Sequence, residues 1–162
     1  MNYPRLFSVF GLVVVALLTR FLPHPPNFTA INAIAIFSAY TTGNQRISFF
    51  SLFAAMFISD LFLGLHSQMG FVYLSLALST LLCRVRVPLL FSISASSFFF
   101  FVIVNFGVWL LDGIFPRTLT GLGLCYTAAL PFLSYQLLGD FFFSALLFGS
   151  FSFLKTRTYE FA

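Results

Sequence analysis

Long apolar runs, separated by short polar or proline-rich breaks, are the feature that most constrains how this chain folds. A membrane-spanning helix needs about 20 predominantly apolar residues. The runs at residues 29–42 and 71–82 are shorter than a full span, which is tolerated where protein covers the backbone. The predicted helices cover residues 6–21, 29–42, 47–65, 71–82, 88–111 and 131–154. The sequence thus predicts an all-α integral membrane bundle of about six transmembrane helices, forming one domain over residues 1–162.

The composition excludes an ordinary soluble domain. Hydrophobic residues make up 60% of the chain and charged residues only 7%, and the mean hydropathy is +1.01. Soluble domains carry about 25% charged residues, so this chain has too few to cover a water-facing surface. The net charge of +4 comes from a few residues in the breaks and is no footprint for nucleic acid. We therefore expect the lipid bilayer to surround the chain.

The basic residues predict how the helices are oriented. The positive-inside rule places the side with most Lys and Arg in the cytoplasm. Both termini fall on that side, and the break at residues 20–28 falls on the outer side. The predicted cytoplasmic set is Arg5, Arg46, Arg84, Arg86, Lys155 and Arg157, and the predicted outer set is Arg20 and Arg117.

Two of the breaks have unusual sequences. Residues 20–28 (RFLPHPPNF) contain three prolines, which lack an N–H group and block a continuous helix, so we expect a rigid elbow on the outer face. Residues 112–130 are too apolar for an ordinary loop and too rich in glycine for a good span. We predict a short interfacial or re-entrant helix at residues 120–130, and Pro131 fits the first turn of the last helix.

Cysteine and histidine usage predicts neither a disulfide framework nor a metal site. Cys83 and Cys125 fall near opposite faces of the predicted bundle, so we expect two free thiols. His24 and His66 are both on the outer side, but their spacing matches no zinc motif. We interpret both histidines as solvated or capping residues and expect no metal and no cofactor.

Polar residues inside the apolar runs predict a binding site, because an ionised side chain at the bilayer centre costs about 2.5–3.5 kcal/mol. On the predicted topology these residues converge beneath the elbow, as in a ligand cavity that opens outward. The alternative is that the aspartates pair with Arg20 or Arg117 and only lock the bundle. The predicted ligand-binding residues are Arg20, Asn27, Asn32, Asp60, Asn105, Trp109, Tyr126 and Asp140.

Small residues predict where helices pack closely. Ala35 and Ala39 are spaced Ala-x-x-x-Ala on the second run, a pattern that brings helix backbones together in membranes. Ordinary packing within the bundle is one interpretation. Docking of another membrane subunit on Ala35 and Ala39 is the other.

Catalytic motifs are missing from the sequence. The chain contains no phosphate-binding Gly-x-x-x-x-Gly-Lys run, and its sole lysine is Lys155. It also lacks a Gly-x-Ser-x-Gly nucleophile elbow and a His-Glu-x-x-His metal motif. We therefore predict a protein that is not an enzyme, with no catalytic residues.

Several segments resemble a known family. They are residues 27–37 (NFTAINAIAIF), 105–109 (NFGVW), 120–126 (TGLGLCY), 131–132 and 138–140. Together they resemble the signature of a family of small, uncharacterised bacterial membrane proteins with six spans, and the resemblance covers most of the chain. It implies a multi-pass protein of the bacterial inner membrane and carries no assigned activity.

In size, span count and orientation the chain also resembles the substrate-capture (S) subunits of energy-coupling-factor vitamin transporters. That resemblance implies a vitamin or metal ion taken from outside into a cavity, closed by the loop between the first two helices. It also implies two kinds of partner, a transmembrane coupling protein and ATPases. Those subunits usually carry Ala-x-x-x-Ala on the first helix, whereas here Ala35 and Ala39 lie on the second.

The leading hypothesis is a membrane solute-binding or transport component that captures a small molecule from the outer face and works with separate energising subunits. The elbow and residues 112–130 would act as its gates. The alternative is a non-transporting scaffold in cell-envelope assembly, which should lack an outward cavity. A self-contained proton-coupled carrier is a third reading and requires Asp60 or Asp140 to be reached from both sides in turn.

Overall fold

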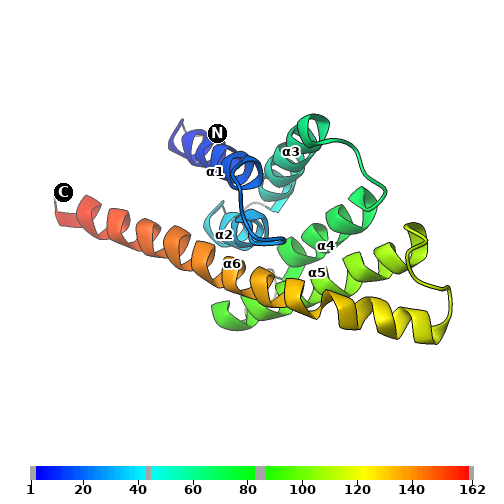
Figure 1. Ribbon diagram of the computed structural model, residues 1–162. Coiled ribbons are helices and arrows are strands. Elements are labelled where there is room, and N and C mark those ends of the chain that lie inside the picture. Colours follow the sequence, from blue (N-terminus) through cyan, green and yellow to red (C-terminus); the bar gives the residue numbers. More distant parts are fainter. Residues whose placement is uncertain (1–2, 43–44, 83–86, 161–162) are drawn as a thin grey trace.

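The computed structural model describes residues 3–42, 45–82 and 87–160, and these residues form a helical bundle without a strand (Figure 1). The all-α prediction is confirmed for this part of the chain. Cys83, Arg84 and Arg86 lie outside the described residues. The helices are α1 (Tyr3–Phe21), α2 (Ile31–Thr42), α3 (Gln45–Leu63), α4 (Met69–Leu82), α5 (Leu89–Leu111) and α6 (Leu119–Glu160).

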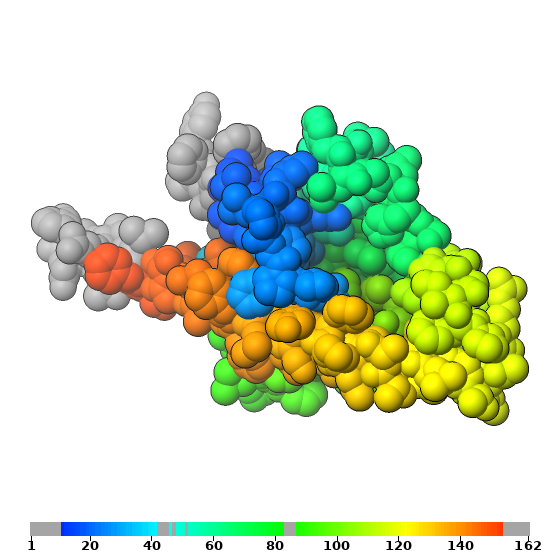
Figure 2. Space-filling view, viewed as in Figure 1, coloured from blue at the N-terminus to red at the C-terminus, as the bar shows by residue number. Residues whose placement is uncertain are grey.

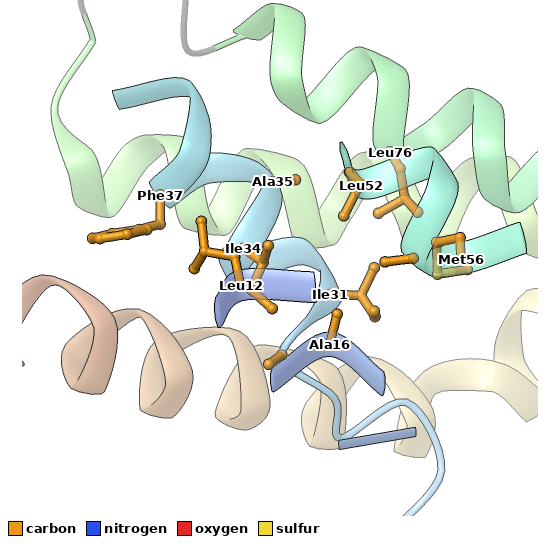
Figure 3. Close-up of a cluster of buried hydrophobic side chains, with 11 residues drawn as sticks. Leu12, Ala16, Ile31, Ile34, Ala35, Phe37, Leu52, Met56 and Leu76 are labelled. Carbon is orange, nitrogen blue, oxygen red and sulfur yellow. The ribbon is translucent and has the colours of Figure 1, made fainter. Parts of the chain in front are cut away.

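The short helix α2 lies at the centre of the bundle. It contacts each of the other helices in Figure 1, and residues 30–38 are all buried. Because protein surrounds its backbone and side chains, a 12-residue helix needs neither the length of a full span nor a polar outer face. Figure 3 shows the resulting core, in which α2 packs between side chains of α1, α3 and α4. Its central members include Ala16, Ile34, Ala35, Leu52 and Leu76.

The last helix is longer than the sequence predicts. Residues 119–160 form one continuous helix of 42 residues, with Pro131 in its interior, so the prediction of a separate short helix at residues 120–130 is wrong. Proline removes one backbone hydrogen bond from a helix, and α6 continues on both sides of that position. The Thr118 side chain accepts a hydrogen bond from the Gly121 N–H at 3.1 Å, which caps the start of α6. At 1.5 Å per residue the helix is about 63 Å long.

Two helical segments in the described residues are long and apolar enough to cross a membrane. They are α5 and Leu119–Phe153 of α6. The remaining apolar helices, for example Ile31–Thr41 and Met69–Leu82, are shorter. By length and composition the structure therefore supports two spans, and six are not confirmed.

A polar cluster joins the start of α4 to the end of α5. The Gln68 side chain donates to Asp112 Oδ1 at 2.6 Å, and the Ser67 hydroxyl donates to the same oxygen at 2.9 Å. Gly107 permits this approach, because a Cβ atom there would lie 2.5 Å from Gln68 Oε1 and from the Phe71 ring. Because glycine has no side chain, Gly107 lets α4 and α5 approach each other closely at this end of the bundle.

Candidate functional site

The elbow between α1 and α2 is held by short-range hydrogen bonds. The Phe28 N–H donates to the Pro25 carbonyl at 3.0 Å, and Asn27 adopts a left-handed conformation with φ of 64°, which asparagine tolerates better than most residues. The Ala30 N–H donates to Thr19 Oγ1 at 3.3 Å. This last bond ties the end of the elbow back to α1, so the chain reverses within a few residues.

The elbow rests against the middle of α6. Gly139 makes this possible, because a Cβ atom there would lie 3.2 Å from Phe28 Cα. The Phe28 ring also packs against Phe142 and Phe143, with ring centroids 6.0 and 5.6 Å away. In Figure 2 the elbow crosses α6, and the surface is hollowed beside it, toward the α3–α4 connection.

A buried ion pair lies directly behind the start of the elbow. Arg20 Nη2 lies 2.6 Å from Asp60 Oδ1, and the other Arg20 amino group donates to Ser59 Oγ at 2.7 Å. The Tyr73 hydroxyl donates to the second Asp60 oxygen at 2.6 Å. Asp60 is 0% exposed, so its carboxylate is fully enclosed by partners from α1 and α4. This arrangement matches the alternative role considered for Asp60, in which the aspartate pairs with Arg20 and holds the bundle together instead of binding a ligand.

A second buried carboxylate lies deeper, where α2, α5 and α6 meet. Asp140 is 1% exposed, and its Oδ2 atom accepts hydrogen bonds from Asn32 Nδ2 at 3.0 Å and from Ser97 Oγ at 2.6 Å. Gln136 precedes Asp140 by one helical turn, so the two side chains share a face of α6. Asn32 Oδ1 and Gln136 Oε1 are buried without a hydrogen-bond partner among the described residues.

A cavity of about 350 Å³ lies between the elbow and these polar groups. Its apolar wall comes from helices α2 to α5, including Ile31, Met56 and Leu76. Such a volume is at the lower end of the range for small-molecule pockets. The structure brings together at this cavity four of the predicted ligand-binding residues, Arg20, Asn27, Asn32 and Asp140. The other polar lining residues are His24, Thr29, His66 and Gln136.

The remaining predicted ligand-binding residues lie elsewhere. Asp60 pairs with Arg20 and does not line the cavity. Asn105 lines a separate cavity of about 380 Å³, and its amide donates to the Phe101 carbonyl at 2.8 Å. The Trp109 indole and the Tyr126 hydroxyl donate to the backbone carbonyls of Pro116 and Val102, at 2.9 and 2.7 Å. These last contacts fasten α5 to the α5–α6 connection and to α6.

Of the predicted docking residues, Ala35 is internal, and so is the described cysteine, Cys125. Ala35 is fully buried in the core in Figure 3, and Ala39 is half-buried. In this structure the contacts of Ala35 are therefore made within the chain. Cys125 is a buried free thiol that lines the same cavity as Asn105.

Sequence reasoning missed several residues of the first cavity. Gln136 had a readable signal, since it lies four residues before Asp140 in a helix and so shares its face. His24 and His66 are both exposed, as expected for solvated side chains, and both also line the cavity, which the sequence did not predict. Ser97 does not line the cavity but donates to Asp140, and it carried no signal, because one serine on a serine-rich helix gives no hint that it will meet an aspartate 43 residues away.

The fold and the cavity together define a small all-α bundle with a polar pocket in an apolar interior. Residues 1–161 match the family of unknown function DUF6580. The chain belongs to this family, which agrees with the resemblance to an uncharacterised family seen in its sequence. No curated protein and no solved structure gives a significant match.

Proposed function

We propose that this protein is a membrane-embedded solute-binding component that captures a small polar molecule from the outer face of the membrane. The observation that carries the proposal is the 350 Å³ cavity, whose polar lining comes from the elbow and from helices that are otherwise apolar. Pockets of this kind, largely apolar with a few placed polar groups, are typical of small-molecule sites. A scaffold has no need of such a cavity.

The distribution of polar and apolar residues supports a membrane setting. The described part of the chain exposes many large apolar side chains, among them Phe62 at 77% and Leu90 at 68%, whereas Asp60 and Asp140 are buried. In water this arrangement would leave apolar patches uncovered. In a bilayer the same exposed side chains face lipid, and the buried polar groups find partners inside the protein.

Access from outside is supported by the placement of the connections and charges. In Figure 1 the α3–α4 and α5–α6 connections lie at one end of the bundle, and the C-terminus lies at the other. The basic residues near the C-terminus, Lys155 and Arg157, favour a cytoplasmic location for that end. His24 and Asn27 are exposed residues of the elbow that also line the cavity, so the elbow is suited to closing over a solute.

Energy for transport would come from other subunits, since the sequence has no phosphate-binding loop. We propose a transmembrane coupling protein and ATPases as these partners. Their docking surface lies outside the buried Ala35 position, because that residue already packs inside the chain.

Native mass spectrometry of the protein, extracted gently into detergent, tests capture directly. We expect the wild-type protein to carry an additional mass that corresponds to a small solute. The variant Val72→Phe should lose it, because Val72 lines the cavity and the larger ring fills the space. Co-purifying subunits, if present, appear in the same spectrum.

Val104→Phe is the matched control, because it makes the same change in the wall of the second cavity. It should keep the bound solute. Equal loss in both variants would point to general unfolding, which circular dichroism would register. A wild-type protein that carries no solute and is stabilised by no tested solute would contradict the proposal.

A further inference from the structure

Hydrogen-bond acceptors gather on one wall of the cavity. Asn32 and Gln136 are each 4% exposed, and each has a side-chain carbonyl oxygen without a partner among the described residues. The orientation of the Asn32 amide is fixed, because a carboxylate only accepts hydrogen bonds and Asp140 therefore requires the NH₂ group. These unpaired carbonyls lie next to the Asp140 carboxylate, and all three residues line the cavity.

The same wall carries the Asp140 carboxyl group, which has no basic partner among the described residues. Among the side chains that the structure describes, no Lys, Arg or His nitrogen lies within salt-bridge distance of Asp140. Arg20 also lines the cavity, but Asp60 matches its charge at 2.6 Å. This wall of the cavity therefore presents two unpaired carbonyl oxygens and a carboxyl group that no described cation pairs.

Buried polar groups without partners are costly, and a bound group that supplies the missing donors removes that cost. A ligand with a carboxylate or phosphate would add a second anion to this wall. A ligand with a protonated amine supplies both a positive charge and several N–H donors, which form strong charge-assisted hydrogen bonds with carboxylates.

We propose that the captured solute carries a cationic, hydrogen-bond-donating head group of the primary ammonium or guanidinium class. Asp140 binds its charge, and the carbonyl oxygens of Asn32 and Gln136 accept its remaining N–H groups. This inference rests on the proposed function and specifies the chemistry of the molecule that is captured.

A set of matched probes on one benzyl framework tests the inference with the full-length protein in detergent. Benzylamine presents a cationic donor, benzyl alcohol a neutral donor, benzoate an anion, and benzyltrimethylammonium a cation without N–H groups. The readout is the rise in unfolding temperature with probe concentration, which gives an apparent Kd. We expect benzylamine to bind most tightly of the four.

Variants then locate the interaction. Asp140→Asn should weaken benzylamine binding by about 10-fold or more, as expected for the loss of a charged hydrogen-bond partner. Gln136→Leu removes one acceptor without changing the charge and should weaken it by about 10-fold as well, so it serves where Asp140→Asn fails to fold. Asp112→Asn removes the same charge at an exposed site outside the cavity and should leave the apparent Kd unchanged.

The outcomes separate this inference from the proposed function. Preferential stabilisation by benzoate or benzyl alcohol, or an anionic or neutral co-purified solute, would overturn the cationic class while leaving solute capture intact. Equal binding of benzylamine and benzyltrimethylammonium would overturn the role of the Asn32 and Gln136 carbonyls. If no probe stabilises the protein and no solute co-purifies, capture itself is refuted.

Discussion

Arg20 at the end of α1 and Asp60 in α3 form an ion pair with a nitrogen–oxygen distance of 2.6 Å, although they are 40 residues apart in the chain. Arg20 is also the first residue of the elbow, so the pair fixes the elbow to the body of the bundle. Because Asp60 is completely buried, neither charge can be removed without leaving the other one poorly solvated.

Breaking this pair should be strongly destabilising. We expect Asp60→Asn and Arg20→Gln each to lower the free energy of unfolding by about 3–5 kcal/mol, since each leaves an uncompensated charge in the bundle. The double variant should lose clearly less than the sum of the two, because its remaining groups are both neutral. Unfolding in detergent, followed by circular dichroism, measures all three; strictly additive losses would argue against direct coupling.

The Tyr73 hydroxyl is predicted to support the same carboxylate. Tyr73→Phe removes the side-chain donor that Asp60 Oδ2 has among the described residues, and an unsatisfied buried acceptor costs about 1–3 kcal/mol. The control is Tyr135→Phe, because Tyr135 is exposed and such surface changes usually alter stability by within about 0.5 kcal/mol. Equal stability of the two variants would show that the Tyr73 bond contributes nothing.

Two neighbouring glycines of α6 should respond differently to alanine. A Cβ atom at Gly121 would collide with the Pro116 carbonyl, whereas Gly123 has open space around it. Gly121→Ala should therefore cost about 1–3 kcal/mol and disturb the bond from the indole of Trp109 to Pro116. Trp109 is the single tryptophan, so its fluorescence should shift to longer wavelength in Gly121→Ala and stay unchanged in Gly123→Ala.

The proposed orientation in the membrane predicts which positions can be labelled from outside. In a protein whose native cysteines are replaced, a cysteine introduced by His24→Cys should react with a membrane-impermeant maleimide in intact cells. A cysteine introduced by Lys155→Cys should react only after the cells are permeabilised. The reverse pattern would show that the bundle is inserted the other way round.

Much of the local structure could be predicted from the sequence. The prolines at 23, 25 and 26 end α1 and produce the elbow, because proline and the residue before it are disfavoured in a helix interior and three prolines lie within four positions. The apolar runs gave the first five helices within a few residues of their ends. The local signal failed at residues 119–160, where the glycines and Pro131 indicated a break and α6 nevertheless continues.

Part of the site was also predictable. Ionisable and amide side chains in apolar runs are costly, which singled out Asn32, Asp60 and Asp140 as buried groups. Periodicity alone places Gln136 beside Asp140. Which of them line the cavity was not predictable, because that depends on partners more than 40 residues apart, such as Asn32 and Asp140.

The sequence by itself determined that this chain is helical, apolar and broken by a rigid elbow, because propensity and hydropathy act over a few residues. Only the tertiary structure decided that α2 is the enclosed central helix, that Asp60 is matched by Arg20, and that Asp140 lines the cavity with no cation from the described residues beside it. The physical reason is that pairing of charges and enclosure of space depend on which helices pack together. Hydropathy makes those helices apolar on most faces, and so leaves their choice of neighbours to the fit of individual side chains.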